Sequence, residues 1–413
     1  MKELFKNKLL VAIIILILIF VPLNIGTHSE TESRAIVIGV GVDYEEEDKQ
    51  FAISTQVIIP HYSSTFSENL KLISAKGESI EMCFENLSLH LGKRLALAHT
   101  NVLLLGQGTK AVNYSKIIDF FIRSTRLNNN CMIALSDDST AKDVLETVTQ
   151  INNSFTLSLN NVMRYNSDYI ISVEETLAGI LDDYYKIYPA TLVPIIELTT
   201  QDEEGIPQDA LTGQSGGQSS NQGSDSSQQE QKKTISNNGE AGIYKRGVFV
   251  EKLAIDKVLA YKILKGGRLG LLVAKDVCDN IYDHATVTAS IGNKSQVMKV
   301  GFKNGIPYAK FVIKIGIKVE DIMQDTVNLT LLAGSKNLVT DALVNSLKTE
   351  IKAQVSELVN FVKNNNVDIL NIYETFYKFC PKEFIDFVSN NGGIEEFLSH
   401  LSVYMDLDIT KLP

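Results

Sequence analysis

The stretch RAIVIGVGVDYEEEDKQFAISTQVII, residues 34–59, decides the class of fold, because it places two β-branched runs on either side of an acidic turn. The apolar runs 35–42 and 51–59 have the composition of strands. The acidic residues 45–48 between them predict a solvated turn, since a calcium loop would need a glycine and alternating oxygen ligands. We therefore predict an antiparallel hairpin here.

Two glycines inside the first run, Gly39 and Gly41, raise the question of a dinucleotide-binding loop. That motif requires a strand, a glycine-rich turn and a helix in that order. Here the glycines lie within the predicted strand, lack a third glycine at the right spacing and lead into the acidic turn. They predict close backbone packing within a sheet instead.

Strands and helices alternate along the next hundred residues. Ile80, Cys83, Phe84 and Leu87 recur at helical spacing, and Gly92 closes that helix. The same reasoning predicts strands within 69–77, 99–108 and 131–138, and helices within 78–92, 113–125 and 137–149. The first half of the chain is therefore expected to mix α and β elements.

Residues 197–240 interrupt this pattern, being dense in Gln, Ser, Gly and Asn and poor in large apolar residues. Such a segment cannot bury enough surface to offset its backbone entropy, and it is predicted to be disordered. It fits either a surface loop or an interdomain linker. We favour a loop, because 241–256 reads as a hairpin that could pair with the extended segment 190–198.

The last third predicts three strands, two helices and a final strand. Turn formers at Gly292–Asn293 and Asn304–Gly305 are the strongest hairpin signals in the chain. One long helix carries an apolar stripe, and its members are Leu347, Ile351, Val355, Leu358 and Val362. This order is typical of a sheet with helices on one face.

The N-terminus has the pattern of a secretion signal or signal-anchor, in which Lys2, Lys6 and Lys8 precede the apolar run Leu9–Leu23. As a helix this run is about 22 Å long, short of the ~30 Å hydrocarbon core, but the lysines and neighbouring residues can extend it. The basic end stays in the cytoplasm, which places the remaining chain outside. No persuasive small-residue cleavage site follows, so retention as a single-pass anchor within residues 1–26 is favoured over cleavage.

The formal charge of −10 argues against a nucleic-acid partner, which requires a basic face. The four cysteines stand apart without a C-x-x-C pair, and they fit buried small hydrophobic residues, although a disulfide stays possible; they are Cys83, Cys131, Cys278 and Cys380. The histidines are scattered, and His90 and His99 are too far apart for a helical metal pair. We predict no catalytic, cofactor-binding or metal-ligating residue, no cofactor, and no enzyme activity.

Six blocks of the chain resemble, in order, the C subunits of bacterial spore germinant receptors, the Ger(x)C family. The first is residues 32–60, and the second, 77–108, carries the family pattern at Gly92, Lys93, Arg94, His99 and Gly106. The third block contains Arg123 and Arg126 between a helix and a strand. The others are 241–254, 367–384 and 401–409.

The resemblance implies three mixed α/β domains on the outer face of the inner spore membrane. It also implies a non-catalytic subunit that works with two polytopic membrane subunits, of A and B type, in nutrient sensing. Members usually carry a lipid-modified cysteine after the apolar run, whereas here Gly26 is followed by Thr27. The family's basic tail ending in glycine is replaced by residues 410–413, TKLP.

The predicted fold class is α+β: a transmembrane helix, then mixed α/β domains with antiparallel-rich sheets on which helices pack. The N-terminal GerAC-like region is predicted to span 30–196 as two subdomains, with 241–266 returning to it, and the C-terminal domain to span 267–413. The leading functional hypothesis is a membrane-tethered, non-enzymatic germinant receptor subunit. The alternatives are a secreted or cell-surface binding or scaffold protein, and an extracytoplasmic hydrolase.

Overall fold

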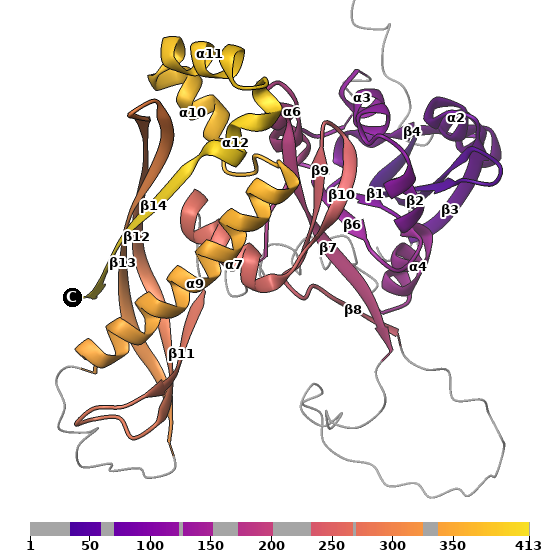
Figure 1. Ribbon diagram of the computed structural model, residues 1–413. Helices are drawn as coiled ribbons and strands as arrows, with labels where there is room; N and C mark the ends of the chain where they lie inside the picture. The colour runs from indigo at the N-terminus through magenta and orange to yellow at the C-terminus, as the bar shows by residue number, and fades with distance from the viewer. Residues whose placement is uncertain are drawn as a thin grey trace, which may run out of the picture.

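The computed structural model describes residues 34–58, 70–123, 127–151, 172–200, 233–266, 270–324 and 338–412. They form two β-sheets, each covered by helices and lying side by side (Figure 1). The predicted signal-anchor, residues 1–26, lies outside these ranges. Among the described helices, none combines the length and apolar character needed to cross a bilayer.

The first sheet has ten strands in the main order β10-β9-β7-β6-β5-β1-β2-β3, with β4 beside β1 and β8 beside β7. The strands are β1 (Arg34–Glu45), β2 (Gln50–Ile58), β3 (Leu70–Gly77), β4 (Arg94–Ala96), β5 (Val102–Leu105), β6 (Met132–Ser136), β7 (Ala190–Thr200), β8 (Lys233–Ser236), β9 (Ala241–Lys245) and β10 (Val248–Leu253).

The predicted hairpin is confirmed, because β1 and β2 pair antiparallel from Ile36↔Ile58 to Glu45↔Gln50. The centre of the sheet differs from the prediction of antiparallel-rich sheets, since β1, β5, β6 and β7 run parallel to one another. Central parallel strands are covered on both faces, which explains why β5, Val102–Leu105, is apolar at every position.

Helices cover both faces of these parallel strands. On one face lie α2 (Ile80–Leu91), α3 (Ser115–Arg123) and α6 (Leu177–Tyr184). On the other face lies α4 (Ala141–Ile151). Short 3-10 turns η4 (Leu97–His99) and η5 (Gln107–Ala111) flank β5. Helix α2 ends at Gly92 as predicted, in a left-handed C-cap with φ 60°, and at its start the Ser79 hydroxyl accepts from the Met82 amide.

The close packing predicted for the glycine pair is confirmed at Gly41. A Cβ atom at this position would lie 2.9 Å from the Ala141 Cβ and 2.9 Å from Leu145 Cδ1, so a side chain would push α4 off the sheet. At Gly39 the ladder with β2 shifts register, which marks a β-bulge. The two glycines therefore serve packing and strand geometry.

Strand β7 pairs antiparallel with β9, from Ala190↔Lys245 to Pro194↔Ala241, as the sequence had suggested for these two segments. The structure differs from the predicted disordered loop, 197–240, near both ends of that segment, where the chain forms strands. Strand β7 continues to Thr200, and β8 pairs with it from Glu197↔Ser236 to Thr200↔Lys233. Residues 201–232 lie outside the described residues. The β-branched residues Thr199, Thr200 and Ile235 favour this extended pairing over a loop.

The second sheet has the order β11-β12-β13-β14, with β11 (Leu271–Val277), β12 (Ala285–Lys303), β13 (Ile306–Met323) and β14 (Ser402–Lys411). The hairpin predicted at Asn304–Gly305 is confirmed, and these residues have φ 54° and 77°, as a two-residue turn requires. The turn predicted at Gly292–Asn293 is wrong. Strand β12 runs through it with a bulge, because β13 continues opposite and keeps the ladder intact.

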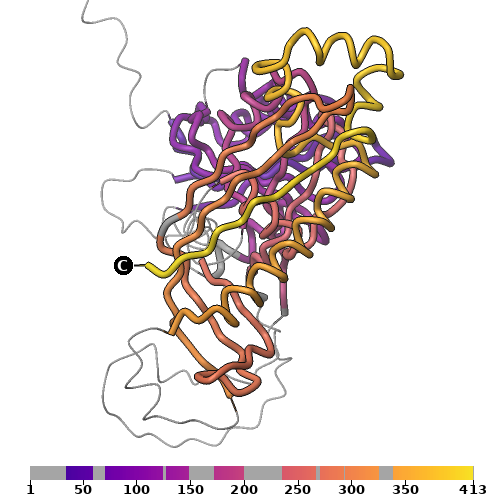
Figure 2. Tube along the Cα trace, turned by 60° about the vertical axis from the view of Figure 1, so that its left-hand side comes forward, coloured from indigo at the N-terminus to yellow at the C-terminus, as the bar shows by residue number. Residues whose placement is uncertain are grey.

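Helix α9 (Asp341–Asn365) packs along this sheet and buries all five residues of its predicted stripe. The remaining helices are α7 (Ile255–Lys265), α10 (Ile372–Phe379), α11 (Pro381–Asn390), η7 (Ile394–Glu396) and α12 (Phe397–His400). The segment 241–266 is divided between the two sheets. Its strands β9 and β10 extend the first sheet, while α7 packs in the core of the second. Figure 2 shows β14 and α9 side by side along the length of the second sheet.

Candidate functional site

The parallel strands β1, β5, β6 and β7 give the first sheet an amino edge, where they start, and a carboxyl edge, where their shared pairing ends. Ligands of open α/β sheets bind outside the carboxyl edge. The residues that follow the paired stretches there are Asp43, Gly106, Asp137 and Glu197. The candidate site therefore lies at this edge.

Asp43 is buried and caps the N-terminus of α4. Its Oδ1 accepts from the Ala141 amide at 2.7 Å and its Oδ2 from the Lys142 amide at 3.1 Å. Burial raises the pKa of Asp43 to about 6, although the two backbone hydrogen bonds act to lower it. A carboxylate at a helix N-terminus also meets the positive end of the helix dipole. Asp43 therefore fixes α4 on the strand from which it projects.

Gly106 and Gly108 let the next loop pass close to β1. A Cβ atom at position 106 would lie 1.8 Å from Asp43 Oδ1, and one at position 108 would lie 2.2 Å from the Tyr44 carbonyl oxygen. The loop is then held by the Thr109 hydroxyl, which donates to the Gly106 carbonyl at 2.7 Å. Gly106, singled out by the family resemblance, thus has a packing role at this edge.

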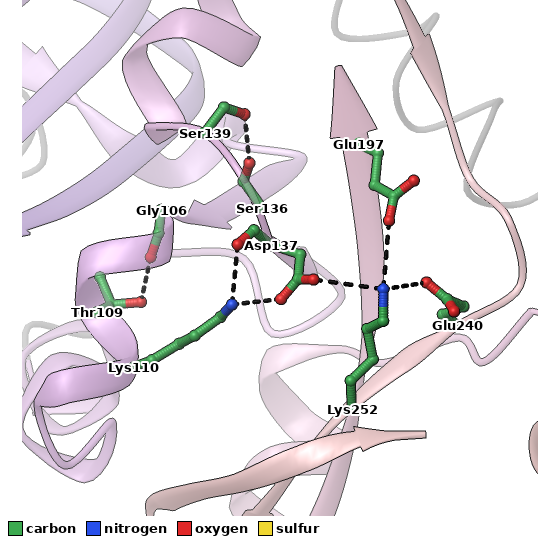
Figure 3. Close-up of polar contacts among 9 residues, drawn as sticks. All are labelled: Gly106, Thr109, Lys110, Ser136, Asp137, Ser139, Glu197, Glu240 and Lys252. Atoms are coloured by element: carbon green, nitrogen blue, oxygen red, sulfur yellow. Dashed lines mark hydrogen bonds and ion pairs between the residues drawn. The ribbon is translucent and has the colours of Figure 1, made fainter. Parts of the chain in front are cut away.

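An ion-pair network lies beside this loop (Figure 3). Lys252 Nζ, from β10, lies 2.7 Å from Glu240, 3.4 Å from Asp137 and 3.6 Å from Glu197. Lys110, from η5, forms an ion pair with the Asp137 carboxylate and also donates to the backbone carbonyl oxygen of Asp137 at 2.9 Å. The network therefore connects the β9–β10 hairpin to β6 and β7.

Each charged side chain of this network faces a partner of opposite charge. Burial alone would raise the pKa of Asp137, but Lys110 and Lys252 outweigh it and hold that pKa below its usual value. The hydrogen bond to Glu240 and the surrounding carboxylates raise the pKa of Lys252. The nearby Ser136 and Ser139 hydroxyls pair with each other at 2.7 Å. The ion pairs at the carboxyl edge therefore hold neighbouring strands together.

A second polar cluster joins the first sheet to the C-terminal helices. Glu395, at η7, accepts from the Tyr188 hydroxyl and from Asn366 Nδ2, the latter at 2.6 Å, and lies 3.3 Å from Arg246. The Arg246 guanidinium also lies 4.7 Å from the centre of the Tyr188 ring, a cation–π contact. Burial would raise the pKa of Glu395, but Tyr188, Lys245 and Arg246 hold it below its usual value.

A cavity of 250 Å³ lies next to this junction, between α6, α7 and the segment before α10. Its polar lining includes Glu175, Asp183, Lys186, Tyr261 and Lys265. Burial, together with the charge of Asp183, raises the pKa of Glu175 to about 8, and burial lowers the pKa of Lys265 to about 8. These groups make the junction sensitive to pH.

The residues that carry the family resemblance are distributed over the first sheet. Gly92, Lys93 and Arg94 line one groove of 1150 Å³ at the amino edge, together with Arg34 from the start of β1. His99 lies in the 3-10 turn η4, and Gly106 lies at the opposite edge. Arg123 pairs with Asp119 within α3, while Arg126 lies outside the described residues.

Within the described ranges, no three His, Cys, Asp or Glu side chains are placed to hold a metal ion. Cys83 and Cys131 are buried, as predicted for small hydrophobic residues, whereas Cys278 is exposed and Cys380 partly buried. Sequence reasoning missed Asp43 and Lys252 as organising residues. The one available signal was Asp43 itself, a lone acidic residue at the end of a buried run.

Two family models match the chain, each to one of its halves. The model described as "Spore germination protein N-terminal domain" matches residues 27–198, and the model described as "Spore germination B3/ GerAC like, C-terminal" matches residues 238–410. Among solved structures, the chain is similar to one titled "Crystal Structure of the GerBC protein". The two share 14% sequence identity and a TM-score of 0.50 over 91% of this chain and 97% of that chain, which shows a common fold. No curated protein shows significant sequence similarity to the chain.

Replacing the buried carboxylate that caps α4 tests the role given to Asp43. We expect Asp43→Ala to lower the free energy of unfolding by about 2–4 kcal/mol, because the buried Ala141 amide and the partly buried Lys142 amide lose their acceptor. Asp43→Asn retains one acceptor oxygen and should cost less. Glu146→Ala, an exposed change on the same helix, should stay within about 0.5 kcal/mol of wild type in urea denaturation. Equal stability of Asp43→Ala and Glu146→Ala would contradict the capping role.

The raised pKa of Glu175 predicts a pH-dependent stability. Between pH 5 and 8 the folded protein retains a proton on Glu175 that the unfolded chain has released, so the free energy of unfolding falls as pH rises through this window. Glu175→Gln removes the titrating group, and its stability should fall less steeply over this range. Urea unfolding at pH 6, 7 and 8 measures both slopes. Parallel slopes for the two proteins would show that Glu175 titrates normally.

Proposed function

The chain belongs to the GerAC-like family of spore germination proteins, and we propose that it is a non-catalytic, membrane-tethered subunit of a spore germinant receptor. The observation that carries this proposal is the family match itself. The two models lie in chain order and together span both sheets.

The non-catalytic role is supported by the arrangement of the carboxyl edge. In an α/β enzyme this edge usually presents reactive groups to a ligand. Here the Asp43 carboxylate accepts a hydrogen bond from the first turn of α4, and the Asp137 carboxylate forms ion pairs with Lys110 and Lys252. The side chains that converge there are therefore engaged in holding loops and strands together.

Membrane tethering rests on the sequence before β1. Lys2, Lys6 and Lys8 followed by the apolar run Leu9–Leu23 form a signal-anchor pattern, and Thr27 stands where relatives carry a lipid-modified cysteine. In this proposal the uncleaved apolar segment replaces the lipid, and the folded part lies outside the cytoplasm at the inner spore membrane. Its partners there are polytopic membrane subunits of A and B type.

Deleting the gene from its spore former tests the receptor role. We expect slower germination with at least one nutrient, measured as loss of optical density, and recovery on complementation with the wild-type gene. A Glu146→Ala allele serves as the matched control and should complement fully. Normal germination over a full nutrient panel, in a parent strain whose spores contain the protein on immunoblots, would refute the proposal.

The state of the N-terminus tests the tether. We expect an intact mass and an N-terminal sequence that include residues 1–26 for protein from the membrane fraction. Leu16→Arg should reduce the membrane-bound share, because a central arginine costs about 2.5–3.5 kcal/mol on insertion. A mature start near Thr27, with protein released from the membrane, would favour the alternative of a secreted or cell-surface binding or scaffold protein.

A further inference from the structure

The amino edge of the first sheet gathers elements from both halves of the molecule. Helices α3 and α6 lead into β6 and β7, and α2 leads into β4, which pairs with the start of β1 at Arg34↔Arg94. Helix α10 joins them, because the Ile187 amide, just before β7, donates to Glu374 Oε1 at 2.5 Å. Helices α2, α3, α6, α10 and α11 accordingly lie at the same end of the molecule in Figure 1, and the yellow C-terminal helices keep that place in Figure 2.

The chain reaches β1 at this edge after the apolar run that ends at Leu23. The ten intervening residues, 24–33, span at most about 35 Å when fully extended. Strand β1 has 12 residues, so the sheet is about 40 Å long in the strand direction. A linker of this length is shorter than the sheet, so in an anchored chain the amino edge at Arg34 lies within about 35 Å of the end of the apolar run and closer to the bilayer than the carboxyl edge can be drawn.

Exposed aromatic side chains concentrate at the same edge. Tyr184 and Tyr185 lie at the end of α6, Tyr377 in α10 and Phe379 at the end of α10, and they are 47%, 78%, 50% and 64% exposed. In the described part of the chain, only Tyr404 on β14 joins them among the exposed aromatic residues. The end of α6 and the start of α10 are held together, since Lys186 Nζ donates to Asn371 Oδ1 at 3.1 Å.

We propose that the aromatic face, defined as Tyr184, Tyr185, Tyr377 and Phe379, rests in the headgroup region of the bilayer that holds the anchor. The inference rests on the membrane tether of the proposed function. Aromatic rings favour this region, because tyrosine combines an apolar ring with a hydroxyl that stays hydrated. The tether brings the face to the membrane surface whether or not a partner protein is present.

Charge plays a minor part in this contact. The amino edge carries both signs, because Arg34, Lys93 and Arg94 share their groove with Glu81 and Glu85. Helix α11 likewise exposes Lys382 next to Glu383 and Asp386. A face of mixed charge gains little from anionic lipid, so the contact should form on phosphatidylcholine and should persist in salt. A protein partner is the competing occupant, because aromatic residues also suit protein interfaces.

Site-specific fluorescence in proteoliposomes tests the proposal with the full chain and no partner protein. The background is Cys278→Ser with Cys380→Ser, which removes the exposed and the partly buried thiol. An environment-sensitive label is attached at Tyr185→Cys or Tyr377→Cys. The matched control is Val273→Cys on β11, 43% exposed and far from the amino edge (Figure 1). The vesicles are phosphatidylcholine with or without bromine on the acyl chains near the headgroup.

We expect brominated lipid to lower the fluorescence at positions 185 and 377 about twofold, as for side chains that enter the headgroup boundary, and to leave position 273 unchanged. Flotation on a density gradient measures anchoring separately. A chain that fails to float refutes the tether, and with it the proposed function. A chain that floats while all three labels are quenched alike refutes only the aromatic face on lipid. Labels at 185 and 377 that become shielded only in native membranes would assign the face to a protein partner and overturn the lipid contact.

Discussion

Burial of the strands β1, β5, β6 and β7 on both faces is the constraint on which the rest of the structure depends. Their side chains point alternately into the two hydrophobic cores on either side of the sheet, as Leu103 and Leu104 do. Parallel strands need crossover connections, and these connections contain the helices α2, α3, α4 and α6. Because each crossover returns to the same edge, the strand direction separates an amino edge from a carboxyl edge. Every polar cluster described above lies at one of these edges or at the junction beside β7.

Strand β7 carries this organisation into the second half of the molecule. Along its length it contributes Leu192 to the core of the second sheet, Ile195 to the core under α2 and α3, and Ile196 to the core under α4. The residues just before it reach the C-terminal helices, where Tyr188 packs on Tyr373 with ring centres 4.9 Å apart. Glu395 closes the contact by accepting from Tyr188 and facing Arg246. The two halves are therefore joined by a shared strand and a charged contact together, rather than by a linker alone.

Local patterns in the sequence predicted the local structure well. The hairpin of residues 34–59, the stripe of α9 and the Asn304–Gly305 turn each depend on residues close in sequence. The failures depend on distant partners. Gly292 has the chemistry of a turn, but β13 lies opposite it and continues the ladder, so a bulge forms instead. Asp43 could not be identified as a cap, because the amide that it accepts from belongs to Ala141, 98 residues further on. The parallel order of the central strands is likewise a property of the whole chain.

The two edges differ in how their polar groups are used, and this difference bears on function. At the carboxyl edge, Lys252 is surrounded by three carboxylates from separate strands and loops, so its charge is paired within the protein. At the amino edge, the side chains of Leu89 and Tyr185 are each 78% exposed. Apolar surface of this kind gains free energy when it is covered, whereas charged side chains that already pair with one another gain little from a new partner. External contacts of this protein are therefore expected from the edge where the chain emerges from its proposed anchor, and the opposite edge keeps the fold together.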